Sequence, residues 1–346
     1  MAITGIKPPD FDSLAGIDGA DVIWKTFDEY REMVSPYLEE AFNRALRDLL
    51  GSITMRQADT ILSALQAGKK IRGVLTCMIC QSLGGTLESA IPRAIAVEMI
   101  HAATLIHDDF VDQDRTRRNL PAVWTIEGAR RAVLIGDVIF ATAIETMSLI
   151  GRDDGFVVAK AIAEISKGAL YEPLDHRVLA QEIESGREIG GIYEDIIRLK
   201  TGILFGTACH LGAIAAHTDI VMQEACYKYG LRIGEAYQIA DDLQDVKKYL
   251  AGESIQPEQM AMLTPALMHF IGDVHPVILG LLNGKTTAID NQSRQPFIAS
   301  AKFMEMEIEG RLKAAVSEIE EVFSRKSFSE LLRTTPLQII MMFNRT

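Results

Sequence analysis

Long stretches of this chain carry apolar residues at the spacing of an α-helix, and this pattern constrains the fold more than any other feature. The clearest stretches are Phe27 to Leu50, Ile91 to Asp112, Arg130 to Leu149, Ile189 to Ala216 and Val221 to Leu250. Alternating strand-like runs are hard to find, and glycines and prolines fall mostly between the stretches. The 346 residues, 48% of them hydrophobic, are enough to bury a large core. The sequence therefore predicts an all-α bundle.

The overall charge restricts the class of partner. A formal net charge of -12 would repel nucleic acids and anionic membrane surfaces, so neither is expected as the main partner. No apolar run reaches the roughly 18 residues typical of a spanning helix, so no transmembrane segment is expected. The first residues, from Met1 to Gly19, lack the basic start and apolar stretch of a signal peptide. These observations predict a cytoplasmic protein.

The first candidate site is an aspartate cluster inside an apolar helix. Asp108, Asp109 and Asp112 have the spacing DDxxD in the segment HAATLIHDDFVDQD. At about 3.6 residues per turn, Asp108 and Asp112 share one helix face with His101. His107 lies on a neighbouring face and is expected to be a structural partner of the helix.

A second cluster repeats this spacing. Asp241, Asp242 and Asp245 stand in YQIADDLQDV, and Gln238 aligns with Asp241 and Asp245 on one helix face. Three unpaired carboxylates within an apolar helix would repel one another and lose hydration, so a cation is expected to compensate each cluster. Carboxylate oxygens suit Mg²⁺, which is commonly completed by water and by phosphate oxygens of a substrate. Each cluster taken alone could also be a solvated helix face.

Basic residues flank the first cluster although the chain is acidic overall. Lys69, Lys70 and Arg72 lie at a predicted junction between a loop and a helix, and Arg117 and Arg118 follow the first aspartates closely. Guanidinium and ammonium groups both bind phosphate oxygens. Together with two magnesium-type clusters, these cations predict a diphosphate site.

These motifs resemble those of the trans-isoprenyl diphosphate synthases, which condense isopentenyl diphosphate with an allylic diphosphate. The similar segments are GKKIR, DDFVDQDRTRR, RLKTGILF and YQIADDLQD, in the order found in that family. The resemblance implies an isoprenoid synthase fold, with residues 26–346 forming one helical domain around a central cavity after a segment 1–25, and a homodimer. It assigns substrate binding to Lys69, Arg72, His101, Arg117, Arg118, Lys200, Thr201 and Gln238, with Arg345 in a C-terminal helix.

The resemblance also implies a mechanism. Mg²⁺ held by Asp108, Asp112 and Asp241, with help from Arg117 and Lys200, would promote loss of diphosphate from the allylic substrate. The double bond of isopentenyl diphosphate would then attack the carbocation.

Product length is expected to depend on the helix that carries the first cluster. Ala103, five residues before Asp108, would lie about 7 to 8 Å below the diphosphate. A small residue there leaves room for a growing chain, so we expect a product of at least four isoprene units. Met99 and Ile100 are candidates for the floor of the chain-length cavity.

Three positions depart from the pattern of the family. Asn119 replaces the usual glycine after the arginine pair, and Gly73 replaces the usual proline after GKxxR. The lysine-containing loop expected after the second cluster is not evident, and Lys247, Lys248 or Lys285 could take its place. Two alternatives to a synthase stay open: a class I terpene cyclase, and a non-catalytic or regulatory subunit that binds prenyl diphosphates.

Overall fold

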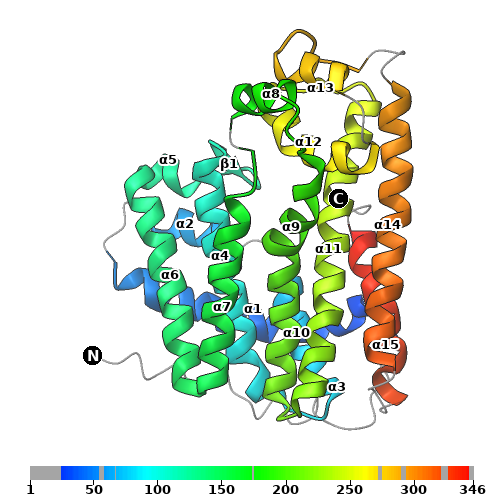
Figure 1. Cartoon of the computed structure of the whole chain (residues 1–346). Coiled ribbons are helices and arrows are strands. Elements are labelled where there is room, and N and C mark those ends of the chain that lie inside the picture. The colour runs from blue at the N-terminus through cyan, green and yellow to red at the C-terminus, as the bar shows by residue number, and fades with distance from the viewer. Residues whose placement is uncertain are drawn as a thin grey trace. The chain divides into compact units, whose positions relative to one another are not determined.

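The computed structural model describes residues 25–53, 58–66, 68–173, 175–271, 275–289, 294–320 and 326–342. Over these ranges the chain is almost entirely helical, with one short antiparallel hairpin, which confirms the all-α prediction (Figure 1). The predicted N-terminal segment 1–25 lies outside the described residues except for Lys25, and Arg345 lies outside them too.

The helices and strands follow one another along the chain from the N-terminus to the C-terminus. They are α1 (Phe27–Gly51), α2 (Ala58–Gln66), α3 (Ile71–Ser82), α4 (Leu87–Val111), β1 (Thr116–Arg117), β2 (Leu120–Pro121), α5 (Val123–Glu127), α6 (Ala129–Ile150), α7 (Arg152–Ala169), α8 (His176–Glu184), the 3₁₀-helix η2 (Gly190–Ile192), α9 (Tyr193–Ile196), the π-helix η3 (Ile197–Gly202), α10 (Ile203–Ala215), α11 (Ile220–Leu250), α12 (Pro257–Ile271), α13 (His275–Leu282), α14 (Arg294–Glu320) and α15 (Lys326–Met341).

Backbone contacts divide the chain into two compact units. Unit 1 comprises Met1–Ala163, Leu204–Gly230 and Val316–Gln338, and unit 2 comprises Glu164–Ile203, Leu231–Ala315 and Ile339–Thr346. The expectation of a single domain over 26–346 stays a prediction.

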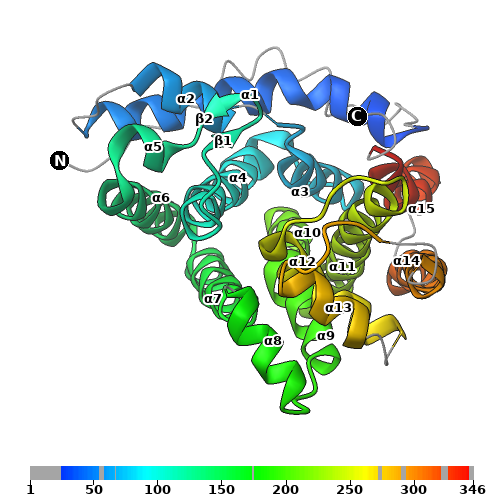
Figure 2. The same cartoon turned by 90° about the horizontal axis from the view of Figure 1, so that it is seen from above.

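Helix α4 is the core helix of unit 1. It packs against α1, α3 and α6 (Figure 2), and most of its side chains are buried. Thr86 caps its N-terminus by accepting a hydrogen bond from the Ser89 amide, and Asp112 forms its C-cap. The first aspartate cluster therefore sits at the end of a buried helix, with Asp109 still buried and Asp112 exposed.

Helix α1 begins at Phe27, where the apolar pattern predicts it, and runs through Pro36. A capping box explains this start, because Thr26 and Glu29 each bind the backbone amide of the other.

Unit 2 has its own apolar core. Residues of α8, α9, the C-terminal part of α11, α12, α13 and α14 form it, among them Tyr193, Val246 and Phe297. Beside this core, the Arg311 guanidinium of α14 bonds to Glu194 of α9, Glu235 of α11 and Glu307 of its own helix. One arginine therefore ties three helices of unit 2 together.

Among the residues that the structure describes, two helices are long and apolar enough to cross a membrane when judged by length and composition alone. They are α4, in which 72% of the most apolar window is buried, and α6, in which 28% is buried. The extent to which α4 is buried is typical of a core helix, whereas α6 exposes an apolar face.

Candidate functional site

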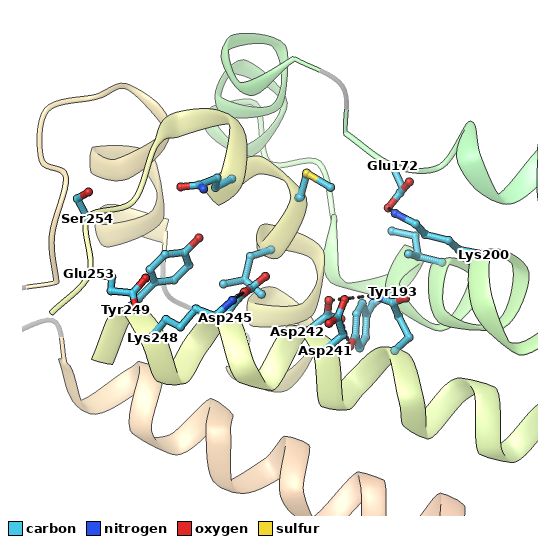
Figure 3. Close-up of a pocket in the computed structure, with 15 residues that line it drawn as sticks. Glu172, Tyr193, Lys200, Asp241, Asp242, Asp245, Lys248, Tyr249, Glu253 and Ser254 are labelled. Carbon is cyan, nitrogen blue, oxygen red and sulfur yellow. Dashed lines mark hydrogen bonds and ion pairs between the residues drawn. The ribbon is translucent and has the colours of Figure 1, made fainter. Parts of the chain in front are cut away.

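The second aspartate cluster lines a pocket in unit 2 with a volume of about 260 Å³ (Figure 3). Helix α11 contributes Gln238, Asp241 and Asp245 to its wall, which confirms that these three side chains share one helix face. Lys200 enters from η3 and Glu172 from the segment after α7. The pocket is therefore lined mainly by charged and polar groups.

The π-helix η3 positions Lys200 and Thr201. Periodicity predicted an uninterrupted helix from Ile189 to Ala216, but this stretch changes from 3₁₀ to α to π before α10 begins. A π-turn inserts one extra residue per turn and often occurs at functional sites. Lys200 forms an ion pair with Glu172, and Thr201 donates a hydrogen bond to Gln238 Oε1 at 2.7 Å.

Asp242 is the most constrained carboxylate of the second cluster. Tyr193 donates its hydroxyl to Asp242 Oδ2 at 2.6 Å, and Gln238 donates its amide to Oδ1 at 3.1 Å. Burial raises the pKa of Asp242 to about 7, and the charge of Asp241 adds to this, although the two hydrogen bonds oppose the shift. Asp242 is thus held rigidly and resists ionisation.

The other two aspartates of this cluster form an acidic pair. The pKa of Asp241 is raised, first by loss of hydration and then by the charge of Asp245. Lys248 donates to Asp245 Oδ1 at 2.7 Å and also lines the pocket. The charge of Asp245 disfavours ionisation of Asp241, and carboxylate oxygens placed this way fit a divalent cation that prefers oxygen ligands.

The first cluster, in unit 1, has a different arrangement. Asp109 is buried and forms an ion pair with Arg117, whose guanidinium also donates to it through Nε. Asp108 lies in the last turn of α4, and Asp112 follows it as the C-cap. In the described part of the chain, no three His, Cys, Asp or Glu side chains are grouped closely enough to hold a metal ion. The metal roles predicted for Asp108, Asp109 and Asp112 stay predictions.

The arginine pair follows in the hairpin of β1 and β2. Arg118 and Asn119 form its turn with φ of 51° and 64°, values in the left-handed region. Two positive φ angles are typical of the tight turn that joins twisted strands. Asn119 keeps this turn because asparagine tolerates the left-handed region best after glycine. The departure from the usual glycine therefore leaves the hairpin intact.

Unit 1 also brings together the residues expected to bind isopentenyl diphosphate. The pKa of His101 is lowered by burial and then by the charges of Arg72, Arg118, Lys70 and Arg117. Arg72 stacks on the Phe205 ring at 4.6 Å.

Gly68 borders the same group of cations. A Cβ on Gly68 would lie 2.9 Å from Arg118 Nη1, so glycine allows this arginine to approach the loop before α3. The cations predicted from the sequence therefore do lie around one histidine, His101, which is neutral because its pKa is lowered.

The comparisons with known proteins agree with this geometry. The family model for polyprenyl synthetase matches residues 55–252, more than half of the chain, and this range contains both aspartate clusters. The chain belongs to the polyprenyl synthetase family. Residues 1–54 and 253–346 lie outside the matched range.

Curated members of the polyprenyl synthetase family match between about half and three quarters of the chain. The geranylgeranyl pyrophosphate synthase of Geoglobus acetivorans is 32% identical over 180 residues, which cover 52% of this chain and 56% of that protein. The heptaprenyl diphosphate synthase component 2 of Bacillus subtilis is 28% identical over 284 residues, covering 78% and 75%. Against the first relatives, the chain spans only about half of their length.

Solved structures of the polyprenyl synthetase family share the fold over most of the chain. A polyprenyl synthase from Caulobacter crescentus, complexed with calcium and isoprenyl diphosphate, superposes with a TM-score of 0.68 at 24% identity. It covers 91% of this chain and 98% of its own. A decaprenyl diphosphate synthase from Rhodobacter capsulatus gives 0.70 at 21% identity, with coverages of 91% and 99%. The isoprenoid synthase type of fold is thus confirmed.

Sequence reasoning missed some residues of the pocket, although Lys200, Gln238 and the three aspartates of the second cluster, which it singled out, do line it. Tyr193 lies seven residues before Lys200. In an α-helix this spacing places two residues on one face, so it could have indicated that both line the same pocket. Glu172 follows a helix end and gives no periodic signal. In unit 1, the Lys70 ammonium is engaged within the protein, because it donates a hydrogen bond to Gln66 O at 2.9 Å and lies over the Phe42 ring. His107 is structural, as expected, since its Nε2 lies 3.1 Å from Val133 O of α6.

Proposed function

We propose that this chain is a trans-prenyltransferase that condenses isopentenyl diphosphate with an allylic diphosphate to give a polyprenyl diphosphate. The observation that carries the proposal is the charged pocket of unit 2, where Lys200 and Lys248 stand beside the acidic pair Asp241 and Asp245. Such a mixture of cations and carboxylates suits a diphosphate bound together with metal ions. Relatives named geranylgeranyl and heptaprenyl synthases support the same reaction class.

Mg²⁺ is the proposed cofactor, held in unit 2 by Asp241 and Asp245 and in unit 1 by Asp108 and Asp112. When bound, it would withdraw charge from the leaving diphosphate and assist cleavage of the allylic carbon–oxygen bond. Asp242 has a positioning role in the proposal, because its two oxygens already accept hydrogen bonds from Tyr193 and Gln238.

The chain's own cations complete the proposed substrate sites. Lys200 would exchange its ion pair with Glu172 for an oxygen of the allylic diphosphate. Arg72 and Arg118, with Lys69 on the exposed loop before α3, would bind isopentenyl diphosphate. Since His101 has a lowered pKa, it can donate a hydrogen bond there as a neutral ring.

The proposal also concerns the length of the product. Ala103 is fully buried in α4, with Ile100 and Met99 buried in the turn before it. A methyl side chain at this depth leaves the space that a growing chain needs, so we propose a product of at least four isoprene units.

We further propose that the protein is a homodimer. Helix α6 exposes Leu134, Val138, Leu149 and Ile150, an apolar face of the kind that a partner surface covers. Light scattering should give twice the chain mass, and Leu134→Glu should shift the protein toward monomer. The absence of a nucleic-acid partner and the cytoplasmic location stay predictions from the sequence.

A regulatory or partner-dependent subunit is the second candidate function. It is favoured by one observation, namely that relatives at 32% and 28% identity are called component 2 of heptaprenyl diphosphate synthases. Such a subunit would bind diphosphates but fail to elongate them alone.

The test is elongation by the purified chain. The protein is incubated with Mg²⁺, labelled isopentenyl diphosphate and allylic diphosphates of different lengths, and products are separated by chromatography. We expect elongated diphosphates, with turnover reduced by about 10² or more in Asp241→Ala, whereas Lys247→Ala should behave as wild type. Binding without elongation would support the subunit, and hydrocarbon release without isopentenyl diphosphate would support a cyclase.

A further inference from the structure

A buried carboxylate of α4 lies beneath the first turn of α3. Glu98 is 3% exposed, and its Oε1 accepts a hydrogen bond of 2.8 Å from the Gly73 amide. Gly73 is the third residue of α3, so its amide has no acceptor within the helix. Lys70, the N-cap, makes no capping bond with its side chain. Glu98 therefore acts as the cap of α3 from a neighbouring helix.

The cap depends on the residue at position 73. Proline, the residue usual after GKxxR in similar sequences, has no backbone N–H and could not donate to Glu98. A side chain is also disfavoured, because a Cβ on Gly73 would lie 2.7 Å from Leu38 Cδ2 and 3.1 Å from Glu98 Cγ. Glycine supplies both the donor and the space.

The carboxylate also stands next to the cationic cluster. Glu98 is three residues before His101 on the same face of α4, and the charges of Arg72 and Arg118 act on that histidine. Arg72 belongs to the turn that Glu98 caps, directly before Gly73, and stacks on Phe205. A shift of this turn would therefore move the Arg72 guanidinium relative to His101 and Arg118.

We propose that Glu98 is a positioning residue, which fixes the first turn of α3 and thereby orients Arg72 for isopentenyl diphosphate. The proposal rests on the proposed function for the identity of that ligand. It adds a residue outside the predicted motifs and gives the glycine at position 73 a role. Glu98 itself need not contact the substrate.

Two pairs of variants separate the hydrogen bond from other effects. Gly73→Ala adds a Cβ but keeps the amide, whereas Gly73→Pro adds a ring and removes the donor. Because proline also disfavours the helical conformation of the residue before it, which is Arg72, the Glu98 pair carries the test of the hydrogen bond itself. Glu98→Gln keeps the length and an oxygen acceptor, whereas Glu98→Ala removes the acceptor. We expect the KM for isopentenyl diphosphate to rise about tenfold from Gly73→Ala to Gly73→Pro. The KM for the allylic substrate should stay the same. Glu98→Gln should stay within about threefold of wild type, and Glu98→Ala should resemble Gly73→Pro.

A second readout does not depend on activity. Hydrogen exchange of the peptide covering residues 69–76, measured without substrate, should become faster in Gly73→Pro than in Gly73→Ala. Equal exchange in these two variants, or an equal KM for isopentenyl diphosphate, would overturn the positioning role. If wild-type protein fails to bind isopentenyl diphosphate in calorimetry, the proposed function fails, while the exchange data still decide whether Glu98 fixes α3.

Discussion

The raised pKa of Asp242 gives the sharpest prediction from the pocket of unit 2. Replacing Asp242 by asparagine should stabilise the metal-free protein at pH 8 and have a much smaller effect at pH 5. Burial raises the folded-state pKa from 3.8 to about 7. Ionising the carboxyl is therefore costlier in the folded protein than in the unfolded chain.

The sign of the pH dependence follows from this difference. Stability contributed by the protonated carboxyl is complete below about pH 4 and is lost as the pH rises toward 7, the folded-state pKa. At about 1.4 kcal/mol per pH unit, the wild type should lose roughly 3 kcal/mol between pH 5 and pH 8 through this one group. Asparagine carries no proton in this range, so Asp242→Asn should not show that loss.

Urea unfolding followed by circular dichroism, in buffers with a chelator at pH 5, 6, 7 and 8, would measure the effect. The free energy of unfolding of Asp242→Asn minus that of the wild type should increase with pH. Tyr193→Phe serves as a matched variant, because it removes a hydrogen bond that lowers the pKa of Asp242 and should extend the loss to higher pH. A difference between Asp242→Asn and wild type that is equal at pH 5 and pH 8 would refute the reasoning.

Four further predictions concern metal, substrate, product and stability. Millimolar Mg²⁺ should raise the melting temperature of the wild type at pH 8, and no shift in calorimetry would contradict a resident metal site. Lys248→Ala should raise the KM for the allylic diphosphate about tenfold or more, whereas Lys247→Ala, which removes an ion pair with Glu305, should leave it unchanged. Ala103→Phe should shorten the product, and an unchanged product pattern would place the floor elsewhere. Arg311→Met should cost about 2 to 3 kcal/mol in urea unfolding, because the buried Glu235 carboxylate loses one of its two arginine partners and keeps only Arg232, and a loss below about 1 kcal/mol would argue against that network.

Periodicity was enough to predict the class of fold and the helices that carry both aspartate clusters. Strong apolar stripes fix such helices, so α6 and α11 begin and end close to the predicted residues. The change to a π-helix at Ile197 leaves no mark in a pattern of apolar residues, because the local pitch is set by packing rather than by composition.

The parts of the candidate site that belong to a sequence motif were predictable, because residue type and spacing within a motif indicate its chemistry. The alignment of Gln238 with Asp241, and the cations around His101, follow from spacing and residue type. Contacts between residues of different elements could not be predicted in this way. Glu172 meets Lys200, Tyr193 meets Asp242 and Glu98 meets Gly73 only after the chain has folded.

The π-helix η3 determines where this part of the chain could lose a residue and still keep the facing of its helices. A turn of π-helix holds about one residue more than a turn of α-helix, so deleting one residue from Ile197–Gly202 would leave an ordinary α-helix whose flanking parts face nearly the same way as before. Deleting one residue from α10, which is regular, would instead turn the side chains on one side of the deletion by about 100° relative to those on the other. Deletions in η3 that spare Lys200 and Thr201 should therefore be tolerated better than deletions in α10.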